Sequence, residues 1–183
     1  MFEPCIFMNI VLIGTRGAGK STVGKKLAAS LGKGFVDTDE LAEMRLGASI
    51  EETVNSKGWD HFRAVEKRIV KEVSRNEGLV IAPGGGAVLD SENVLALKEN
   101  GLIIWLKANK QVLGQRMSED SRTAASRPTL TGKGTIEELE EIMAFRNPIY
   151  KEAADFELDT SGLDVAGVVE RVMAIVEERM GGS

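Results

Sequence analysis

The sequence is poor in the residues that form disulfide bonds and zinc sites. Among its 183 residues it has one cysteine, Cys5, and one histidine. A lone cysteine forms no disulfide bond within the chain, and together with one histidine it cannot supply the ligands of a zinc site. We therefore expect a protein of a reducing compartment, the cytoplasm.

The sequence also has few prolines, and fewer basic than acidic side chains. The chain has 23 Lys and Arg residues against 28 Asp and Glu residues, a formal net charge of −5, and only 4 prolines. Nucleic acids and anionic membranes are bound through an excess of positive charge, so neither partner is expected. With 43% hydrophobic residues, the composition excludes a disordered or fibrous chain.

Nothing in the sequence divides the chain into several domains. Residues 1–183 contain no internal repeat and no Ser/Pro-rich linker, and this length fits one domain, which we expect to act as a monomer. The apolar stretch 1–13 contains Glu3 and Pro4 and has no basic start. It is therefore expected to be neither a signal peptide nor a membrane-spanning helix.

Short apolar runs alternate with segments of helical spacing, which is typical of an α/β fold with a parallel sheet. The apolar runs predict strands at residues 9–13, 34–37, 79–82, 102–106 and 156–158. The helical spacing predicts helices at 21–31, 41–44, 50–55, 59–75, 94–99, 110–117, 136–150 and 165–180. Pro148 lies inside one of these helical patterns and predicts a kink or a break there.

The strongest motif is a phosphate-binding loop. Residues 14–21, Gly-Thr-Arg-Gly-Ala-Gly-Lys-Ser, match G-x-x-x-x-G-K-[ST] between a predicted strand and a predicted helix. Glycines let backbone N–H groups approach phosphate oxygens, and the helix N-terminus adds a favourable dipole. We expect Lys20 to bridge the β and γ phosphates of ATP and Ser21 to ligate Mg²⁺. The other nucleotide-binding residues expected here are Gly17, Ala18, Gly19 and Thr22.

Two alternatives accompany this motif. A glycine-rich turn that binds nothing would have the same composition. Motors, GTPases, sulfotransferase-like proteins and kinases all use phosphate loops, so the loop alone does not specify a reaction.

Asp37 and Asp39 follow the second predicted strand, in the sequence Asp-Thr-Asp. Ligands of parallel sheets lie beyond the carboxyl ends of the strands, so both carboxylates are expected to face the phosphate loop. Their spacing places them on the same side of an extended chain. One can serve the Mg²⁺ ion, while the other orients an acceptor hydroxyl and takes its proton. The alternative is a turn or a helix cap, with Asp39 capping the helix at 41–44.

Two arginines indicate an acceptor that carries a carboxylate. Arg63 precedes Glu66 by three residues on a predicted helix, and Arg146 lies close to Pro148. Glu66 can fix the Arg63 guanidinium so that it presents a rigid fork to a carboxylate. Alternatively, the two side chains form an ion pair on a solvated face, worth only about 0.2–0.5 kcal/mol.

Two further segments can be interpreted either as parts of a binding site or as ordinary turns and loops. The run Gly84, Gly85 and Gly86 offers a floor without side chains for a flat small molecule, although a flexible turn explains it equally well. Residues 118–134 hold one large apolar residue and no periodicity, which indicates a functional loop or a disordered one. Closure of such a loop would bring Arg122 and Arg127 onto the phosphates and exclude water.

Taken in order, the segments GTRGAGKST, DTD, FRAVE, GGG, RPTL and FRNPIY resemble the shikimate kinase family over residues 9–180. The resemblance implies a P-loop fold like that of nucleoside monophosphate kinases, a three-layer α/β sandwich with a five-stranded parallel sheet. It also implies a substrate-binding subregion at about 39–76 and a mobile lid at about 118–134. The implied reaction converts ATP and shikimate into shikimate 3-phosphate and ADP.

The resemblance also implies residue roles. Asp39 would contact the acceptor hydroxyl, and Arg63 and Arg146 would bind the shikimate carboxylate. Gly84, Gly85 and Gly86 would line the ring, Asp37 would serve Mg²⁺, Arg127 would be the lid arginine, and either Arg116 or Arg122 would contact adenine. The rival hypotheses are another small-molecule kinase, acting on gluconate or a nucleoside monophosphate, and an inactive ATP-binding regulatory module.

Overall fold

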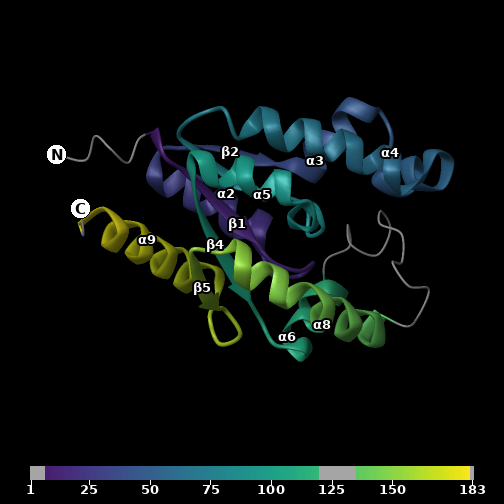
Figure 1. Ribbon diagram of the computed structural model, residues 1–183. Coiled ribbons are helices and arrows are strands. Elements are labelled where there is room, and N and C mark those ends of the chain that lie inside the picture. The colour runs from purple at the N-terminus through teal and green to yellow at the C-terminus, as the bar shows by residue number, and fades with distance from the viewer. Residues whose placement is uncertain (1–6, 120–134, 182–183) are drawn as a thin grey trace.

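The computed structural model describes residues 7–119 and 135–181. Arg122, Arg127 and nearly all of the expected lid therefore lie outside the described residues. The sheet contains five strands, and every pair of neighbours runs parallel (Figure 1). In chain order they are β1 (Asn9–Ile13), β2 (Gly34–Asp37), β3 (Leu79–Ala82), β4 (Gly101–Lys107) and β5 (Phe156–Asp159). Across the sheet the order is β2-β3-β1-β4-β5, which confirms the predicted sheet.

The described helices agree with the predicted segments and extend several of them. They are α2 (Lys20–Leu31), α3 (Thr38–Leu46), α4 (Ile50–Val73), α5 (Ser91–Glu99), α6 (Lys110–Glu119), α8 (Thr135–Ala153) and α9 (Val165–Gly181). A short 3₁₀ turn, η1 (Ala87–Leu89), was not predicted. No helix in the described ranges is long and apolar enough to cross a membrane.

One prediction about helix interruptions is confirmed and one needs correction. The predicted separation of 50–55 from 59–75 is confirmed, because the chain leaves the helical conformation at Gly58 (φ 83°, ψ 165°), within the range of α4. A break at Pro148 is wrong, because α8 continues through it to Ala153. Proline leaves the carbonyl of Ala144 without its helical donor. The helix persists because Tyr150 and Ala153 are buried in the core beyond it.

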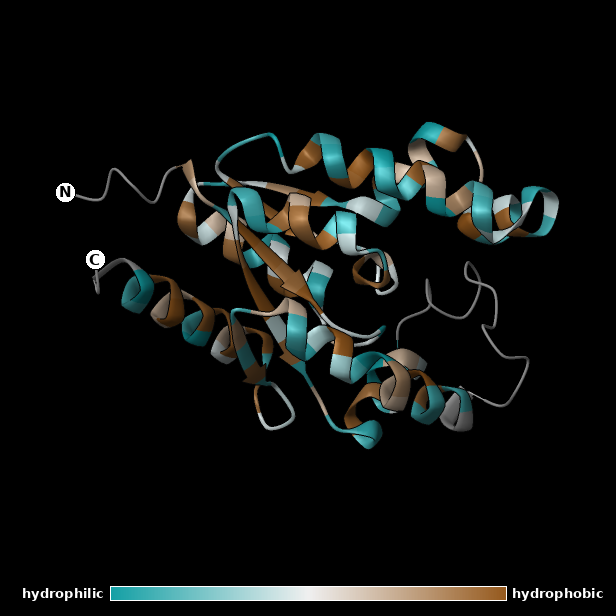
Figure 2. Cartoon of the chain, viewed as in Figure 1, coloured by the Kyte–Doolittle hydropathy of each residue, from teal (hydrophilic) through white to brown (hydrophobic). Residues whose placement is uncertain are grey.

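Alternation along the strands gives the sheet two apolar faces. On β1, Ile10 and Leu12 join a cluster with α2, α6 and α9. Val11 and Ile13 join a second cluster with α4 and α5, and α8 reaches both. Figure 2 shows the hydrophobic strands at the centre of the molecule. The result is the expected three-layer sandwich, with the turns after β1, β2 and β3 together at the carboxyl ends of the strands.

Candidate active site

The phosphate loop connects β1 to α2. Gly17 and Gly19 have φ values of 81° and 88°, which side-chain-bearing residues rarely adopt. Gly19 is the N-cap of α2 and has no side chain to occupy the N–H groups of the first turn, so these are left for an anion. Lys20 Nζ donates to the carbonyl oxygens of Gly14 (2.8 Å) and Thr15 (3.2 Å), which places the ammonium group over the loop.

Asp37 joins the first turn of α2 to the start of α3. Ser21 Oγ donates to Asp37 Oδ2, so the two expected metal ligands lie side by side. Asp37 Oδ1 accepts hydrogen bonds from the backbone N–H groups of Asp39 (2.9 Å) and Glu40 (3.2 Å). Asp37 is therefore the N-cap of α3.

This geometry corrects two predictions about the Asp-Thr-Asp segment. The helix cap is Asp37 rather than Asp39. The prediction that Asp37 and Asp39 lie on the same side of an extended chain is also wrong. Helix α3 begins at Thr38, and the rotation of the helix turns Asp39 to a different side from Asp37. Asp39 is only 8% exposed and lies instead against the glycine turn, which we define as Gly84, Gly85 and Gly86 after β3.

Gly84 brings the acidic side chains together. A Cβ atom on Gly84 would overlap Asp39 Oδ1 and lie 2.9 Å from Glu66 Oε1. The backbone N–H of Gly84 donates to Thr38 Oγ1 (3.0 Å), which ties the end of β3 to the start of α3. Sequence reasoning missed Thr38, whose only signal was a hydroxyl between two aspartates.

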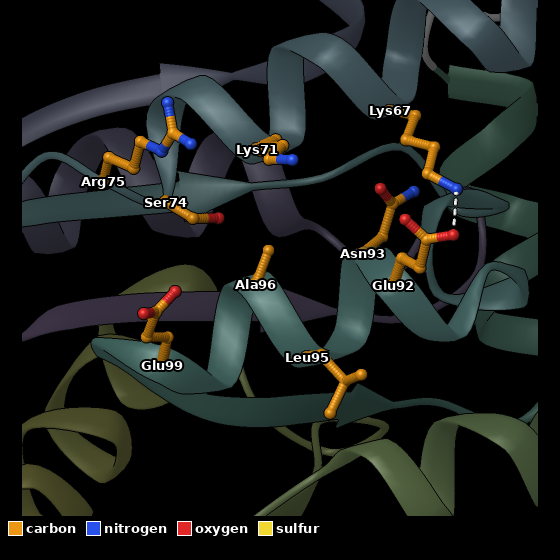
Figure 3. A pocket seen from close by; sticks show the side chains of 9 residues that line it. All are labelled: Lys67, Lys71, Ser74, Arg75, Glu92, Asn93, Leu95, Ala96 and Glu99. Carbon is orange, nitrogen blue, oxygen red and sulfur yellow. Dashed lines mark ion pairs between the residues drawn. The ribbon is translucent and has the colours of Figure 1, made fainter.

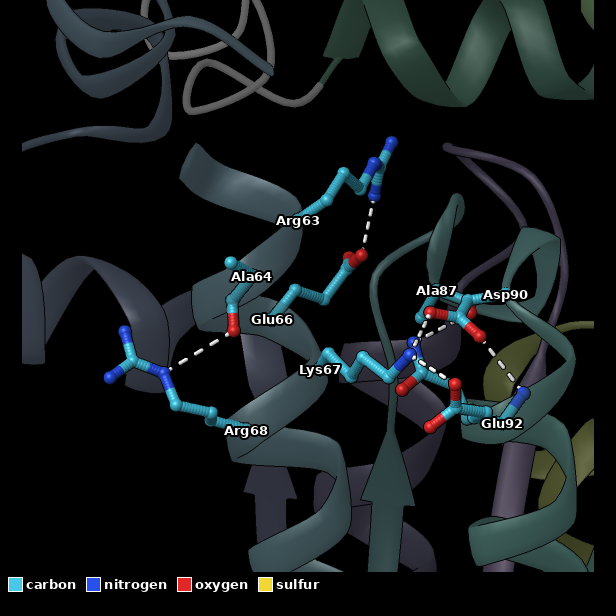
Figure 4. A network of polar contacts seen from close by, with 9 residues as sticks. Arg63, Ala64, Glu66, Lys67, Arg68, Ala87, Asp90 and Glu92 are labelled. Atoms are coloured by element: carbon cyan, nitrogen blue, oxygen red, sulfur yellow. Dashed lines mark hydrogen bonds and ion pairs between the residues drawn. The ribbon is translucent and has the colours of Figure 1, made fainter. Parts of the chain in front are cut away.

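Arg63, whose side chain is half-buried, forms an ion pair with the buried Glu66. Arg63 Nη1 lies 2.6 Å from Glu66 Oε2, and the Glu66 side chain is 3% exposed (Figure 4). The solvated ion pair is therefore wrong as an explanation. The Arg63 guanidinium also stacks over Trp59 at 5.2 Å from its ring centroid, and a Cβ atom on Gly86 would overlap it. These contacts fix the guanidinium from three sides.

Glu66 has a perturbed acidity. Burial raises the pKa of Glu66, and the nearby charge of Asp39 adds to this, while Arg63 and Arg146 act in the opposite direction. Glu66 Oε1 is buried and has no hydrogen-bond partner within the described ranges. An unpartnered oxygen beside the glycine turn costs free energy.

Arg146 reaches the same turn from α8. A Cβ atom on Gly85 would lie 3.4 Å from Arg146 Nη1 and 3.5 Å from the carbonyl oxygen of Gly14. Successive glycines thus contact Asp39, Arg146 and Arg63, and the middle one also borders the phosphate loop. The structure brings together all the described residues that the sequence analysis assigned to the acceptor.

The expected adenine contact is only partly described. Arg116, on α6, donates to Thr160 Oγ1 (3.2 Å) and to the Thr160 carbonyl oxygen (3.0 Å). These bonds hold Arg116 against the turn that follows β5. Arg122 lies outside the described residues, so the choice between the two arginines stays open.

The oxygens of Ser21 and Asp37 suit Mg²⁺, which takes one or two protein oxygens and completes its shell with phosphate oxygens and water. Within the described ranges no group of three or more His, Cys, Asp or Glu side chains could hold a metal ion. A site completed by nucleotide phosphates is consistent with such a sparse set of ligands.

A separate groove of about 410 Å³ lies between α4 and α5 (Figure 3). Lys67 Nζ pairs there with Asp90 Oδ2 (3.0 Å) and Glu92 Oε1 (2.8 Å). These exposed pairs join α4 to the start of α5, just after the 3₁₀ turn that follows the glycines. None of the groove's lining residues belongs to the candidate active site.

Comparison with known proteins gives consistent similarities. A family model described as shikimate kinase matches residues 16–177. The chain is 40% identical over 170 residues to "Shikimate kinase 2" of Yersinia enterocolitica, which covers 93% of this chain and 96% of that protein. Its structure is similar to that of a shikimate kinase from Acinetobacter baumannii in complex with shikimate, with a TM-score of 0.88, 30% identity and 96% of each chain covered.

A more distant likeness concerns one of the rival hypotheses. A gluconokinase from Sinorhizobium meliloti has a TM-score of 0.57 and 18% identity, with 94% of this chain and 93% of that chain covered. Identity at this level shows a common fold alone.

Proposed function

The chain belongs to the shikimate kinase family, and from that premise we propose a role for each site residue. The reaction is the transfer of the ATP γ-phosphoryl group to the 3-hydroxyl of shikimate. The roles are the binding of each substrate and the removal of the hydroxyl proton. The observation that carries the proposal is the glycine turn after β3. Its three glycines contact Asp39, Arg146 and Arg63 in succession, beside the phosphate loop.

Arg63 and Arg146 bind the carboxylate of shikimate. Their guanidinium groups come from different helices, α4 and α8, to adjacent glycines. Glu66 holds Arg63 by a short ion pair, so little side-chain entropy remains to be lost when the substrate binds. Gly84, Gly85 and Gly86 let the flat ring lie close to the backbone.

Asp39 orients the acceptor hydroxyl. As the new O–P bond forms and the bond between the γ-phosphorus and the bridging oxygen breaks, the hydroxyl proton passes to the Asp39 carboxylate and ADP leaves. Phosphoryl transfer has a loose transition state, so alignment of the hydroxyl contributes more than strong basicity. Burial of Asp39 (8% exposed) keeps competing water from this position.

The nucleotide phosphates bind to the loop at residues 14–21. The N–H groups of Gly17, Gly19, Ser21 and Thr22 are the donors, and Ala18, whose N–H donates to the Thr15 carbonyl oxygen (3.2 Å), lines the loop between them. Lys20 exchanges the carbonyl oxygens of Gly14 and Thr15 for phosphate oxygens. Ser21 and Asp37 would hold Mg²⁺, which would neutralise the charge that develops on the phosphates. Arg127 serves the transferring phosphoryl group, and Arg116 or Arg122 contacts adenine.

Other parts of the proposal concern organisation. Residues 39–76 form the substrate-binding subregion of one kinase domain spanning residues 1–183, with the lid at about 118–134. Action as a monomer, residence in the cytoplasm and the lack of nucleic-acid and membrane partners stay predictions. Light scattering after size-exclusion chromatography tests the first of these.

The test is an acceptor panel with a matched arginine control. Purified protein with MgATP should release ADP above background with shikimate, and not with gluconate, AMP or CMP. Arg63→Ala should abolish turnover of shikimate. Arg68→Ala is the control, because Arg68 lies on the same helix and, within residues 7–119 and 135–181, donates only to the carbonyl oxygen of Ala64 (3.3 Å; Figure 4). Turnover by Arg63→Ala equal to that of the control would overturn the carboxylate assignment.

A further inference from the structure

The hydroxyl group of Tyr150 connects two parts of the acceptor site. Tyr150 Oη donates to the carbonyl oxygen of Gly85 at 2.6 Å. Arg146 lies one helical turn earlier on the same face of α8, and its Nη1 atom and Tyr150 Oη lie 3.4 Å and 3.6 Å from the same point, the position of a Cβ atom on Gly85. Because the phenol proton goes to the glycine turn, the phenol oxygen faces its neighbours as an acceptor.

The surroundings of Tyr150 favour a role for the hydroxyl beyond packing. The side chain is fully buried, and its ring lies 5.7 Å from that of Trp105 on β4. A phenylalanine would fill the same volume, and a buried hydroxyl is retained at a cost unless it is hydrogen-bonded. Burial also raises the pKa of Tyr150, despite the opposing charges of Arg146 and Arg63, so the hydroxyl keeps its proton and remains a donor.

Gly85 is the point at which the nucleotide and acceptor sides meet. The Gly14 carbonyl oxygen, Arg146 Nη1 and Tyr150 Oη all lie within 3.6 Å of the position that a Cβ atom on Gly85 would occupy. A rotation of this peptide would move the glycine turn relative to the guanidinium. The Tyr150 hydroxyl opposes that rotation because it donates to the Gly85 carbonyl and lies beside the guanidinium.

We propose that Tyr150 is a positioning residue for the carboxylate end of the shikimate site, in which its hydroxyl holds the Arg146 guanidinium and the Gly85 carbonyl in one fixed arrangement. This inference rests on the proposed function. Tyr150 touches neither substrate; it acts through Arg146 and the glycine turn. Its contribution therefore belongs to shikimate binding rather than to ATP binding or the chemical step.

Tyr150→Phe tests the proposal because it keeps the ring against Trp105. The KM for shikimate should rise about tenfold, the equivalent of one charge-assisted hydrogen bond. The kcat and the KM for ATP should stay within about twofold of the wild type. Ser74→Ala is the matched control, since Ser74 Oγ is also buried and also donates to a backbone carbonyl, that of Val70 (2.7 Å). A KM for shikimate in Tyr150→Phe equal to that of the control would overturn the proposal.

A second measurement uses the wild-type protein, so it does not depend on the variant folding. Tyr150 is the one tyrosine in the chain, and ¹³Cζ-labelled tyrosine therefore gives a single resonance. Titration with shikimate should shift this resonance in the wild type, and Arg146→Lys should reduce the shift at saturating shikimate. An unchanged resonance in the wild type would sink the inference.

These outcomes are separable from failure of the proposed function. Absence of shikimate turnover by the wild-type enzyme would remove the function itself. Normal turnover with loss of activity in Arg63→Ala, together with unaltered kinetics in Tyr150→Phe, would remove only the role of Tyr150.

Discussion

Replacement of Gly86 by alanine should weaken shikimate binding without disturbing the fold. Gly86 has φ −97° and ψ −4°, a conformation open to alanine. The added Cβ atom would lie 2.7 Å from Arg63 Nη1 and 2.8 Å from Cζ, well inside van der Waals contact. The guanidinium ends a long side chain and can move, whereas the turn is buried. Arg63 should therefore leave its place beside Glu66.

The magnitude follows from the hydrogen bonds that Arg63 loses. A hydrogen bond to a charged group contributes about 1.5–3 kcal/mol, and each 1.4 kcal/mol corresponds to about a tenfold change in affinity. The KM for shikimate should rise about ten- to hundredfold. The KM for ATP should not change, because none of the atoms nearest to the added Cβ belongs to the phosphate loop.

Steady-state kinetics with coupled ADP detection measures this change. Gly114→Ala is the control, because beyond its own turn of helix no atom of the described residues lies within 4 Å of its added Cβ, and alanine is favoured within a helix by about 0.5–1 kcal/mol. Circular dichroism melting should show both variants folded. A folded Gly86→Ala enzyme whose KM for shikimate equals that of Gly114→Ala would refute the placement of Arg63 at the acceptor.

Other variants probe neighbouring atoms. Gly84→Ala places a methyl group against Asp39 and should lower kcat about 10²-fold by misaligning the acceptor hydroxyl; an unchanged kcat contradicts the role of Asp39. Lys20→Met should lower kcat by about 10²–10³-fold through the loss of one phosphate donor, measured at saturating ATP. Burial raises the pKa of Glu66 in the folded state. Below its unfolded-state pKa of about 4.3, Glu66 is protonated in both states, so it does not change the stability there. As the pH rises through the folded-state pKa, the wild type loses stability because the buried carboxyl ionises. The melting temperature of Glu66→Gln relative to the wild type should therefore rise as the pH increases from about 4.3 and level off above the folded-state pKa. A relative melting temperature that falls as the pH rises would contradict the direction of the shift.

The sheet could be predicted because each of its strands has a local signature. A run such as Val-Leu-Ile in β1 is buried on both faces, and burial on both faces produces uninterrupted apolar segments. Strand ends were less predictable: β4 begins at Gly101 and ends at Lys107, one residue beyond the apolar run on each side. Backbone pairing with β1 and β5 extends the strand where side-chain polarity gives no signal.

Candidate site residues can be proposed from the sequence where a residue type carries its own chemistry, as with Lys20, Arg63 and Arg146. They cannot be proposed where the contact depends on a partner distant in the sequence. Thr38 and Gly84 are separated by 46 positions, and Tyr150 and Gly85 by 65. No local pattern reports such contacts. The helix cap was predicted in the right segment but at the wrong aspartate, because Asp37 rather than Asp39 caps α3.

The neighbouring positions of β1 and β3 have a consequence for how this architecture can evolve. Val11 pairs with Ile81, so the turns that we propose for the phosphoryl donor and the acceptor ring emerge from adjacent strands, spaced about 4.8 Å apart by backbone hydrogen bonds. The distance between these two turns is thus set by the pairing of the two strands in the core, independently of the acceptor. Side chains on α3, α4 and α8 can be exchanged to suit a new alcohol while that distance stays constant.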